Sequence, residues 1–244
     1  MTHVAVIDYK LCNLDSISRA VEACGASVIK TSDPASLARA DLLVLPGVGH
    51  FGAAMDNLES FGLADAIRRQ IAQGKPLLGI CLGMQLLAEH SEEADGREGL
   101  GLIRAEVVRL RDNAGERVPH MGWNAVEPIR PDPLLDGVEP GADFYFVHSY
   151  RMRCRDPADV AAETAYCGRF ASVVSRGRVM GAQFHPEKSQ TAGFALLENF
   201  LTAYGPAKVP VEAALASSWV RNAQGPRHPH PAAQRRGAGQ RRPF

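Results

Sequence analysis

The sequence predicts an α/β fold in three layers: a mostly parallel central sheet, helices on both faces, and added antiparallel strands. Through the first hundred residues, short apolar runs alternate with segments whose apolar residues recur at helical spacing, as in a parallel sheet that is covered on both faces. After Gly101, strand-like runs follow one another between turn clusters, which is typical of antiparallel or mixed strands.

The first half of the chain supplies the alternation. We expect strands at residues 4–7, 27–29, 42–45 and 77–80. Asn13 is a suitable N-cap for a helix that stops at Gly25, and Asp33-Pro34 favours the start of a short helix. A helix-rich span covers residues 51–73, and a further helix is expected at residues 82–90.

The second half supplies the added strands, which we expect at residues 107–110, 118–126, 144–152, 171–174 and 179–184. Turn clusters such as Arg176-Gly177 separate them. These strands should extend the first sheet and bring His185 back across to Cys81. An amphipathic helix at residues 194–204 closes the domain.

A change in composition divides the chain. Residues 1–204 are expected to form one domain, and they hold 20 Lys and Arg against 26 Asp and Glu. Residues 205–244 hold 7 against 1, with six prolines and four glycines, so we expect a disordered tail. The alternative for the tail is a basic arm that docks on a partner or on RNA.

Composition also excludes several classes of protein. The five cysteines form no C-x-x-C pair, which favours a reduced, cytoplasmic protein over a disulfide framework. We find no secretory signal and no apolar run near the ~20 residues of a membrane span. The domain has no basic stripe for nucleic acid, and His228 and His230 are too little to predict a metal site.

A cysteine between two glycines is the central motif. Cys81 lies on the predicted turn between strand and helix, where Gly79 and Gly83 remove side chains that would collide. A thiol at a helix N-terminus is favoured as the thiolate and is a candidate nucleophile. The alternative is a small buried core cysteine.

Candidate partners for this thiol occur about a hundred residues later. On an extended strand, residues two apart face the same side, so His185 and Glu187 can point together, and Pro186 favours an extended His185. A histidine near the thiol can act as the base, and a carboxylate behind it fixes its tautomer and stabilises its cation. The three residues together predict a nucleophile, a base and an orienting carboxylate.

These motifs, GICLGMQ at residues 79–85 and FHPE at residues 184–187, resemble those of the class I (triad-type) glutamine amidotransferases. The resemblance implies a glutaminase that needs neither metal nor cofactor, with Cys81, His185 and Glu187 as its catalytic triad. The glycine-rich residues 46–52, which alone would indicate an ordinary turn, are then assigned to the oxyanion site. There the amides near Gly49 and at Leu82 would hold the intermediate. The same resemblance implies that L-glutamine is held by Gly47, Gln85, Ser149 and Tyr150.

Three further segments, VPHMGWN at residues 118–124, YFVHSY at residues 145–150 and PEKS at residues 186–189, closely resemble the glutaminase subunits of imidazole glycerol phosphate synthases. This resemblance implies a heterodimer with a cyclase subunit, a (β/α)8 barrel. Ammonia would pass through the barrel to make imidazole glycerol phosphate and an aminoimidazole carboxamide ribotide in histidine biosynthesis. Asn13, Trp123 and Lys188 would lie at the subunit contact.

The sequence departs from this family after the first strand, where D-Y-G-x-G-N is replaced by Lys10 and Cys12 at the glycine positions. A side chain at a positive φ would cost ~1 to 2 kcal/mol there. A diverged glutaminase that feeds another barrel synthase, for example in sugar amidination, therefore stays open. Two further alternatives are a related cysteine peptidase and a non-catalytic regulatory subunit. The peptidase would not need Gln85 or residues 119–124, and the regulatory subunit would more often have lost part of the triad.

Overall fold

The computed structural model describes residues 1–112 and 115–206. The tail expected over residues 205–244, together with His228 and His230, therefore lies outside the described residues except for Gly205 and Pro206. Within the described residues, no helix is long and apolar enough to span a membrane.

A parallel half forms one side of the main sheet, in the order β2-β1-β3-β4-β13 with β2 at the edge. All four predicted strands of the first half are confirmed, and the strand expected at residues 179–184 pairs beside β4. The bounds are β1 His3–Ile7, β2 Ser27–Thr31, β3 Leu42–Gly47, β4 Leu77–Cys81 and β13 Val179–Ala182. In this order the carboxyl ends of β3, β4 and β13 lie side by side, where ligands bind in such sheets.

An antiparallel half continues the sheet beyond β13, in the order β12-β11-β8-β9. The strands expected near residues 118–126 and 171–174 are confirmed, whereas β11 was not predicted. The bounds are β8 His120–Pro128, β9 Ala142–His148, β11 Val160–Ala165 and β12 Arg169–Arg176. Over the described residues the sheet is thus mixed, with five parallel strands followed by four antiparallel ones.

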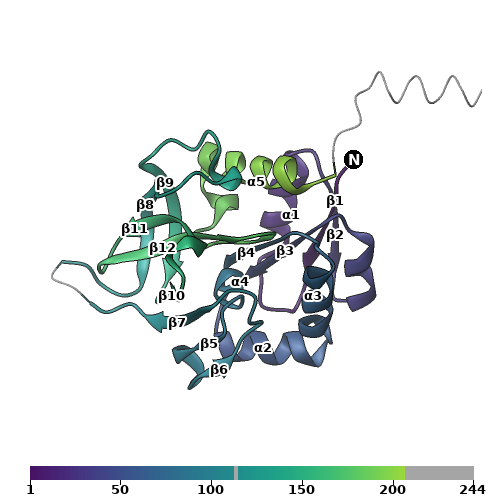
Figure 1. Cartoon of the computed structure of the whole chain (residues 1–244), viewed down its shortest axis with the longest axis horizontal. Helices are drawn as coiled ribbons and strands as arrows, with labels where there is room; N and C mark the ends of the chain where they lie inside the picture. Colours follow the sequence, from purple (N-terminus) through teal and green to yellow (C-terminus); the bar gives the residue numbers. More distant parts are fainter. Residues whose placement is uncertain (113–114, 207–244) are drawn as a thin grey trace, which may run out of the picture. The chain divides into compact units, whose positions relative to one another are not determined.

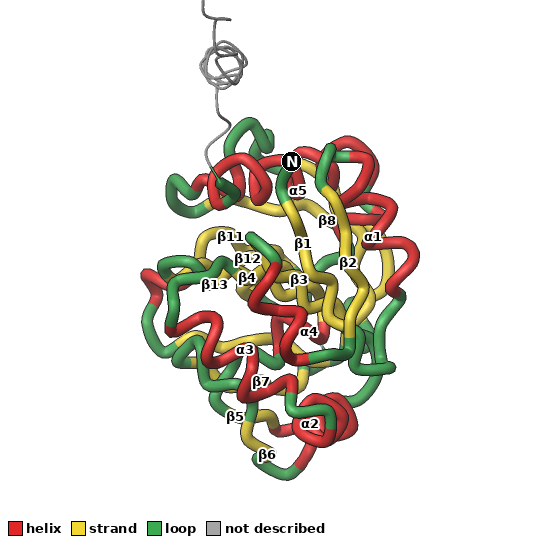
Figure 2. Tube along the Cα trace, turned by 90° about the vertical axis from the view of Figure 1, so that its right-hand side faces the viewer, coloured by secondary structure: helices red, strands yellow, loops and turns green. Residues whose placement is uncertain are grey.

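Helices cover both faces, which confirms the three layers (Figures 1 and 2). Val4 and Val6 pack in the core beneath α1 (Leu14–Ala23) and α5 (Gln190–Tyr204). Ala5 and Ile7, which point the other way, pack in the core with α2 (Phe51–Ser60) and α3 (Leu63–Ala72). Strands buried on both faces explain why these runs are apolar without alternation.

The helix expected at residues 82–90 is shorter than predicted, because α4 runs only from Leu82 to Gln85. The next three carbonyl groups accept hydrogen bonds from the loop at residues 100–103 instead of continuing a helix: Leu100 N to Leu86 O, Leu102 N to Leu87 O, and Gly101 N to Ala88 O, at 2.8 to 3.0 Å. A remote backbone segment therefore ends this helix, and a local apolar pattern does not reveal such a partner.

The run at residues 144–152, expected as one strand, is two strands in different sheets. β9 ends at His148, and β10 (Tyr150–Cys154) joins β7 (Ala105–Arg109) in a small second sheet with the order β10-β7-β5-β6 (Figure 1). The other two strands are β5 (His90–Ser91) and β6 (Arg97–Glu98). Ser149 lies at the switch, and the carbonyl oxygen of Val147 just before it is 3.7 Å from Sγ of Cys81 at the end of β4. Five short 3₁₀ turns complete the described chain: η1 Pro34–Arg39, η2 Glu92–Ala94, η3 Pro133–Leu135, η4 Pro157–Asp159 and η5 Pro186–Lys188.

Candidate active site

Cys81 is the last residue of β4 and adopts φ +54° and ψ −112°, a conformation that a non-glycine residue rarely takes. The neighbouring glycines make room for this turn. An added Cβ on Gly83 would collide with the backbone oxygen of Leu45, and one on Gly79 would lie 2.6 Å from the backbone oxygen of Gly83. The predicted elbow is therefore present, and the backbone of three segments packs too closely for side chains.

His185 and Glu187 form a buried pair. Nδ1 of His185 lies 2.9 Å from Oε1 of Glu187, and the two side chains are 7% and 4% exposed. The sequence placed both on one strand, which is wrong for Glu187, because it lies in the 3₁₀ turn η5. His185 is extended, as Pro186 predicts, and the turn then brings the carboxylate back to the imidazole.

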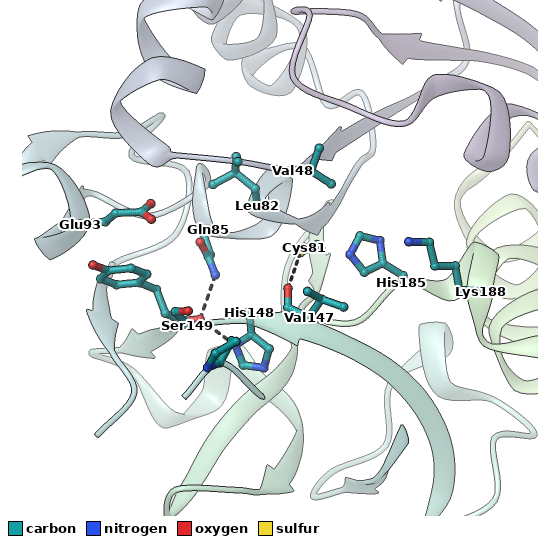
Figure 3. Close-up of a pocket in the computed structure, with 13 residues that line it drawn as sticks. Val48, Cys81, Leu82, Gln85, Glu93, Val147, His148, Ser149, His185 and Lys188 are labelled. Carbon is teal, nitrogen blue, oxygen red and sulfur yellow. Dashed lines mark hydrogen bonds between the residues drawn. The ribbon is translucent and has the colours of Figure 1, made fainter. Parts of the chain in front are cut away.

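The sulfur and the imidazole line the same cavity, of about 300 Å³ (Figure 3). Burial alone would lower the pKa of His185, but hydrogen bonds and charge interactions with Cys81 and Glu187 outweigh burial and raise the pKa to about 10. His185 is therefore favoured in its protonated form at neutral pH.

Six other residues of the predicted site also line this cavity: Gly49, Leu82, Gln85, Ser149, Tyr150 and Lys188. Gly47 is not among the lining residues, and its expected contact with substrate stays a prediction. It is buried beneath the cavity, where a Cβ would overlap the hydroxyl of Tyr9 and lie 2.9 Å from the backbone nitrogen of Gly83. Gly47 thus supports the elbow through close backbone packing.

Glu93 is a lining residue that the sequence did not single out. It comes from η2, and its Oε2 accepts a hydrogen bond of 2.8 Å from the backbone amide of Phe51. Among the described residues that line the cavity, it is the one carboxylate. The sequence did not indicate a role for it, because it lies in the acidic run from Glu92 to Asp95 and such a run usually indicates a solvated surface.

The glycine-rich strand end beside Cys81 is held by the first loop of the chain. The amide of Val48 donates a 2.9 Å hydrogen bond to the carbonyl oxygen of Leu11 and is therefore not available to the cavity. Gly49 follows with φ +108°, a conformation that favours glycine. In the first loop, Lys10 adopts φ +71°, so the side chain that replaces a family glycine does sit at a left-handed position.

Two buried histidines lie at the cavity wall, where His148 lines the cavity and His120 contacts it from behind. Nδ1 of His120 is 2.9 Å from Nε2 of His148, and Nδ1 of His148 is 2.8 Å from the carbonyl oxygen of Tyr150. Burial lowers the pKa of His120 to about 4 and that of His148 to about 3. Both are therefore neutral at neutral pH. Because a carbonyl only accepts, neutral His148 carries its proton on Nδ1, and its Nε2 accepts a hydrogen bond from Nδ1–H of His120.

The residues expected at a subunit contact lie at the surface. Trp123 on β8 is 48% exposed and packs edge to face on Tyr145, with ring centroids 5.9 Å apart. Nζ of Lys188 lies 5.7 Å from the centroid of the same tyrosine ring. Asn13 is exposed and caps α1, accepting a 3.4 Å hydrogen bond from the amide of Ser16. Trp123, Tyr145 and Lys188 thus form one aromatic and basic surface beside the cavity.

Comparison with a family model matches residues 5–204 to "Glutamine amidotransferase class-I". The chain is 46% identical over 198 residues to imidazole glycerol phosphate synthase subunit HisH 1 of Campylobacter jejuni strain 81-176, covering 81% of this chain and 98% of that protein. It is 49% identical over 205 residues to subunit HisH of Geobacillus thermodenitrificans, covering 82% and 96%. With subunit HisH of Salinibacter ruber, identity is 49% over 200 residues, covering 80% and 92%.

Solved structures agree on the fold. A glutamine amidotransferase crystal structure superposes with a TM-score of 0.65 at 22% identity, covering 81% of this chain and 96% of that one. The PurLQS structure from Thermotoga maritima gives a TM-score of 0.65 at 20% identity, covering 82% and 97%. At these identities the likeness extends to the fold alone.

Proposed function

This chain belongs to the class I glutamine amidotransferase family, and from that premise we propose that it is the glutaminase subunit of an imidazole glycerol phosphate synthase. It hydrolyses L-glutamine to glutamate and ammonia for use by a cyclase subunit. The observation that carries the proposal is that Cys81 and His185 line one cavity and Glu187 is bonded to His185, in a chain 46 to 49% identical to such subunits.

In the first step, the thiolate of Cys81 attacks the side-chain amide carbon of glutamine. His185, which holds a proton, donates it to the departing nitrogen, so ammonia leaves and a glutamyl thioester remains. His185 then takes a proton from water, the resulting hydroxide attacks the thioester, and glutamate leaves as the thiolate is restored. Glu187 stabilises the imidazolium, and it fixes the tautomer of the imidazole when the ring is neutral. The raised pKa of His185 supports its part as proton donor.

The tetrahedral intermediate needs hydrogen-bond donors for its oxyanion. Leu82 is the first residue of α4, so its amide has no acceptor within that helix and can point to the intermediate. We assign the second donor to the strand end at Gly49. The neighbouring Val48 amide is bonded to the carbonyl oxygen of Leu11, so it could serve as a donor only after this strand end rearranged. Each donor of this kind is worth about 3 kcal/mol in the transition state.

Several polar groups of the cavity can bind glutamine. The carboxylate of Glu93 complements the positive ammonium group of glutamine. Gln85 uses its side-chain nitrogen on protein acceptors, so its oxygen is left to accept from the substrate. Ser149 and Tyr150 close the wall, at the point where the chain switches sheets.

The partner of this subunit is proposed to be a (β/α)8-barrel cyclase, bound as a heterodimer through the surface of Trp123, Tyr145 and Lys188. Trp123 is exposed and Tyr145 is half-buried beside it, and aromatic side chains of this kind are enriched in interfaces. Free ammonia is largely protonated near neutral pH, which makes direct transfer to the partner useful. The product would then be imidazole glycerol phosphate with an aminoimidazole carboxamide ribotide.

The test is to co-purify the full chain with the cyclase encoded in the same genome and to assay synthesis from glutamine and from ammonium salts. Cys81→Ala should abolish synthesis from glutamine and leave synthesis from ammonium unchanged. Retained use of glutamine by this variant would remove Cys81 from the mechanism. If the wild-type complex hydrolyses glutamine but makes no imidazole glycerol phosphate, the ammonia is used by another acceptor.

A further inference from the structure

We propose that the carboxamide of Gln183 is a further catalytic residue, which favours the nucleophilic thiolate by donating a hydrogen bond to the sulfur of Cys81. This inference rests on the proposed function, because it concerns the same nucleophile. Gln183 follows β13, is fully buried, and holds its Nε2 3.9 Å from Sγ of Cys81. It does not line the cavity, so its contact is with the nucleophile and not with substrate.

The direction of this amide follows from a carbonyl that can only accept. The carbonyl oxygen of Tyr150 lies 2.9 Å from Nε2 of Gln85, which identifies that end of Gln85 as its donor. The same nitrogen lies 3.0 Å from Oε1 of Gln183. Gln183 must therefore turn its oxygen to Gln85 and its nitrogen to the sulfur.

Neighbouring groups keep this order of donors and acceptors fixed. His148 donates to the Tyr150 carbonyl as well, and His120 stands behind His148. The ring of His120 is in turn 3.2 Å from Nδ2 of Asn124, whose nitrogen also donates to the carbonyl of Ala165. Because both histidines are neutral near neutral pH, the donor and acceptor roles in this series of hydrogen bonds do not exchange there. This fixed series of hydrogen bonds holds the side-chain amide of Gln183 in one orientation.

The thiolate needs such a donor because another of its neighbours is an acceptor. The carbonyl oxygen of Val147 lies 3.7 Å from Sγ of Cys81 and accepts a hydrogen bond from the neutral thiol. Once that proton has left, the sulfur faces oxygen lone pairs on this side. A donor at Gln183 offsets that repulsion, since hydrogen bonds to the charged form stabilise it. Catalytic hydrogen bonds are often long without substrate and shorten when it binds.

The test is the rate at which iodoacetamide alkylates Cys81 in the full chain bound to its cyclase, followed by peptide mass spectrometry. Only the thiolate reacts at an appreciable rate. Gln183→Met removes the donor at similar size. We expect alkylation near neutral pH to slow about tenfold, as expected for loss of a hydrogen bond to a charged group. The kcat for glutamine should fall in parallel, with KM unchanged within about twofold.

The matched control is Ser172→Ala. Ser172 accepts a backbone hydrogen bond of 2.9 Å from Gln183, and its buried hydroxyl has no partner among the described residues. This variant perturbs the same part of the core without touching the sulfur, so its alkylation rate should equal that of the wild type. If Gln183→Met does not fold, Gln183→Glu keeps the acceptor for Gln85 and should slow alkylation most at high pH.

Alkylation at the wild-type rate in a folded Gln183 variant would overturn the inference. A loss of kcat without slower alkylation would also overturn it, because Gln183 would then act on the shape of the cavity. Either result leaves the proposed function intact, since that proposal depends on the separate behaviour of Cys81→Ala.

Discussion

Replacing Glu187 with glutamine tests the predicted triad at its carboxylate. The substitution keeps the size of the side chain and an oxygen that can accept from Nδ1 of His185, and it removes the negative charge. The carboxylate lies 2.9 Å from that nitrogen, and both side chains are at least nine-tenths buried. Solvent therefore screens this pair little, and the loss of charge should reach the reaction.

The expected size of the effect follows from the geometry. Two opposite unit charges about 4 Å apart attract by about 4 kcal/mol at an effective dielectric constant of about 20. Because the imidazolium forms as Cys81 gives up its proton, losing this attraction should lower kcat for glutamine by about a thousandfold. Synthesis from ammonium salts should be unchanged, which controls for folding and partner binding. A Glu187→Gln variant that retains more than about a tenth of the wild-type kcat would refute this account of Glu187.

The same pair gives a pH dependence of stability. His185 has its pKa raised to about 10 in the folded protein, against about 6.5 in an unfolded chain. A raised pKa stabilises the fold fully below about pH 6.5 and loses that contribution as the pH rises toward about 10. The free energy of unfolding, measured with urea, should therefore fall over this interval in the wild type and fall less in Glu187→Gln. Equal losses in both proteins would contradict the assignment.

Three further predictions concern the elbow, the first loop and the partner surface. Gly83→Ala should lower the free energy of unfolding by about 2 to 3 kcal/mol, because its methyl group meets the backbone oxygen of Leu45; an unchanged melting temperature would contradict this packing. Lys10→Gly should change stability by less than about 1 kcal/mol in urea unfolding. Glycine relieves the strain of the left-handed φ, but it adds backbone entropy to the unfolded chain and removes the exposed ion pair with Asp8. A large decrease in the free energy of unfolding would show that Lys10 is a stabilising residue. Trp123→Ala should weaken cyclase binding about thirtyfold by calorimetry and leave the melting temperature nearly unchanged, and binding at the wild-type affinity would exclude this surface.

Local patterns were enough for the parts of the fold that depend on neighbours in sequence. The runs at residues 4–7, 42–45 and 77–80 are apolar throughout because helices cover both faces of their strands, and that property is visible in the sequence. The elbow was visible too, since Gly79 and Gly83 flank Cys81 and a tight turn requires both. Motifs on adjacent residues therefore predicted the turn on which Cys81 lies.

Contacts between distant segments decided the rest. The helix after Cys81 stops at Gln85 because backbone amides of residues 100–103 take its next carbonyl groups. Glu187 reaches His185 through a 3₁₀ turn and not along a strand, and Glu93 enters the cavity from a surface-like acidic run. The direction of the Gln183 amide depends on Gln85 and on the Tyr150 carbonyl, which come from other elements. A hydrogen bond has both a partner and a direction, and neither is fixed until folding brings remote backbone and side chains together, whereas apolar periodicity is a property of the chain itself.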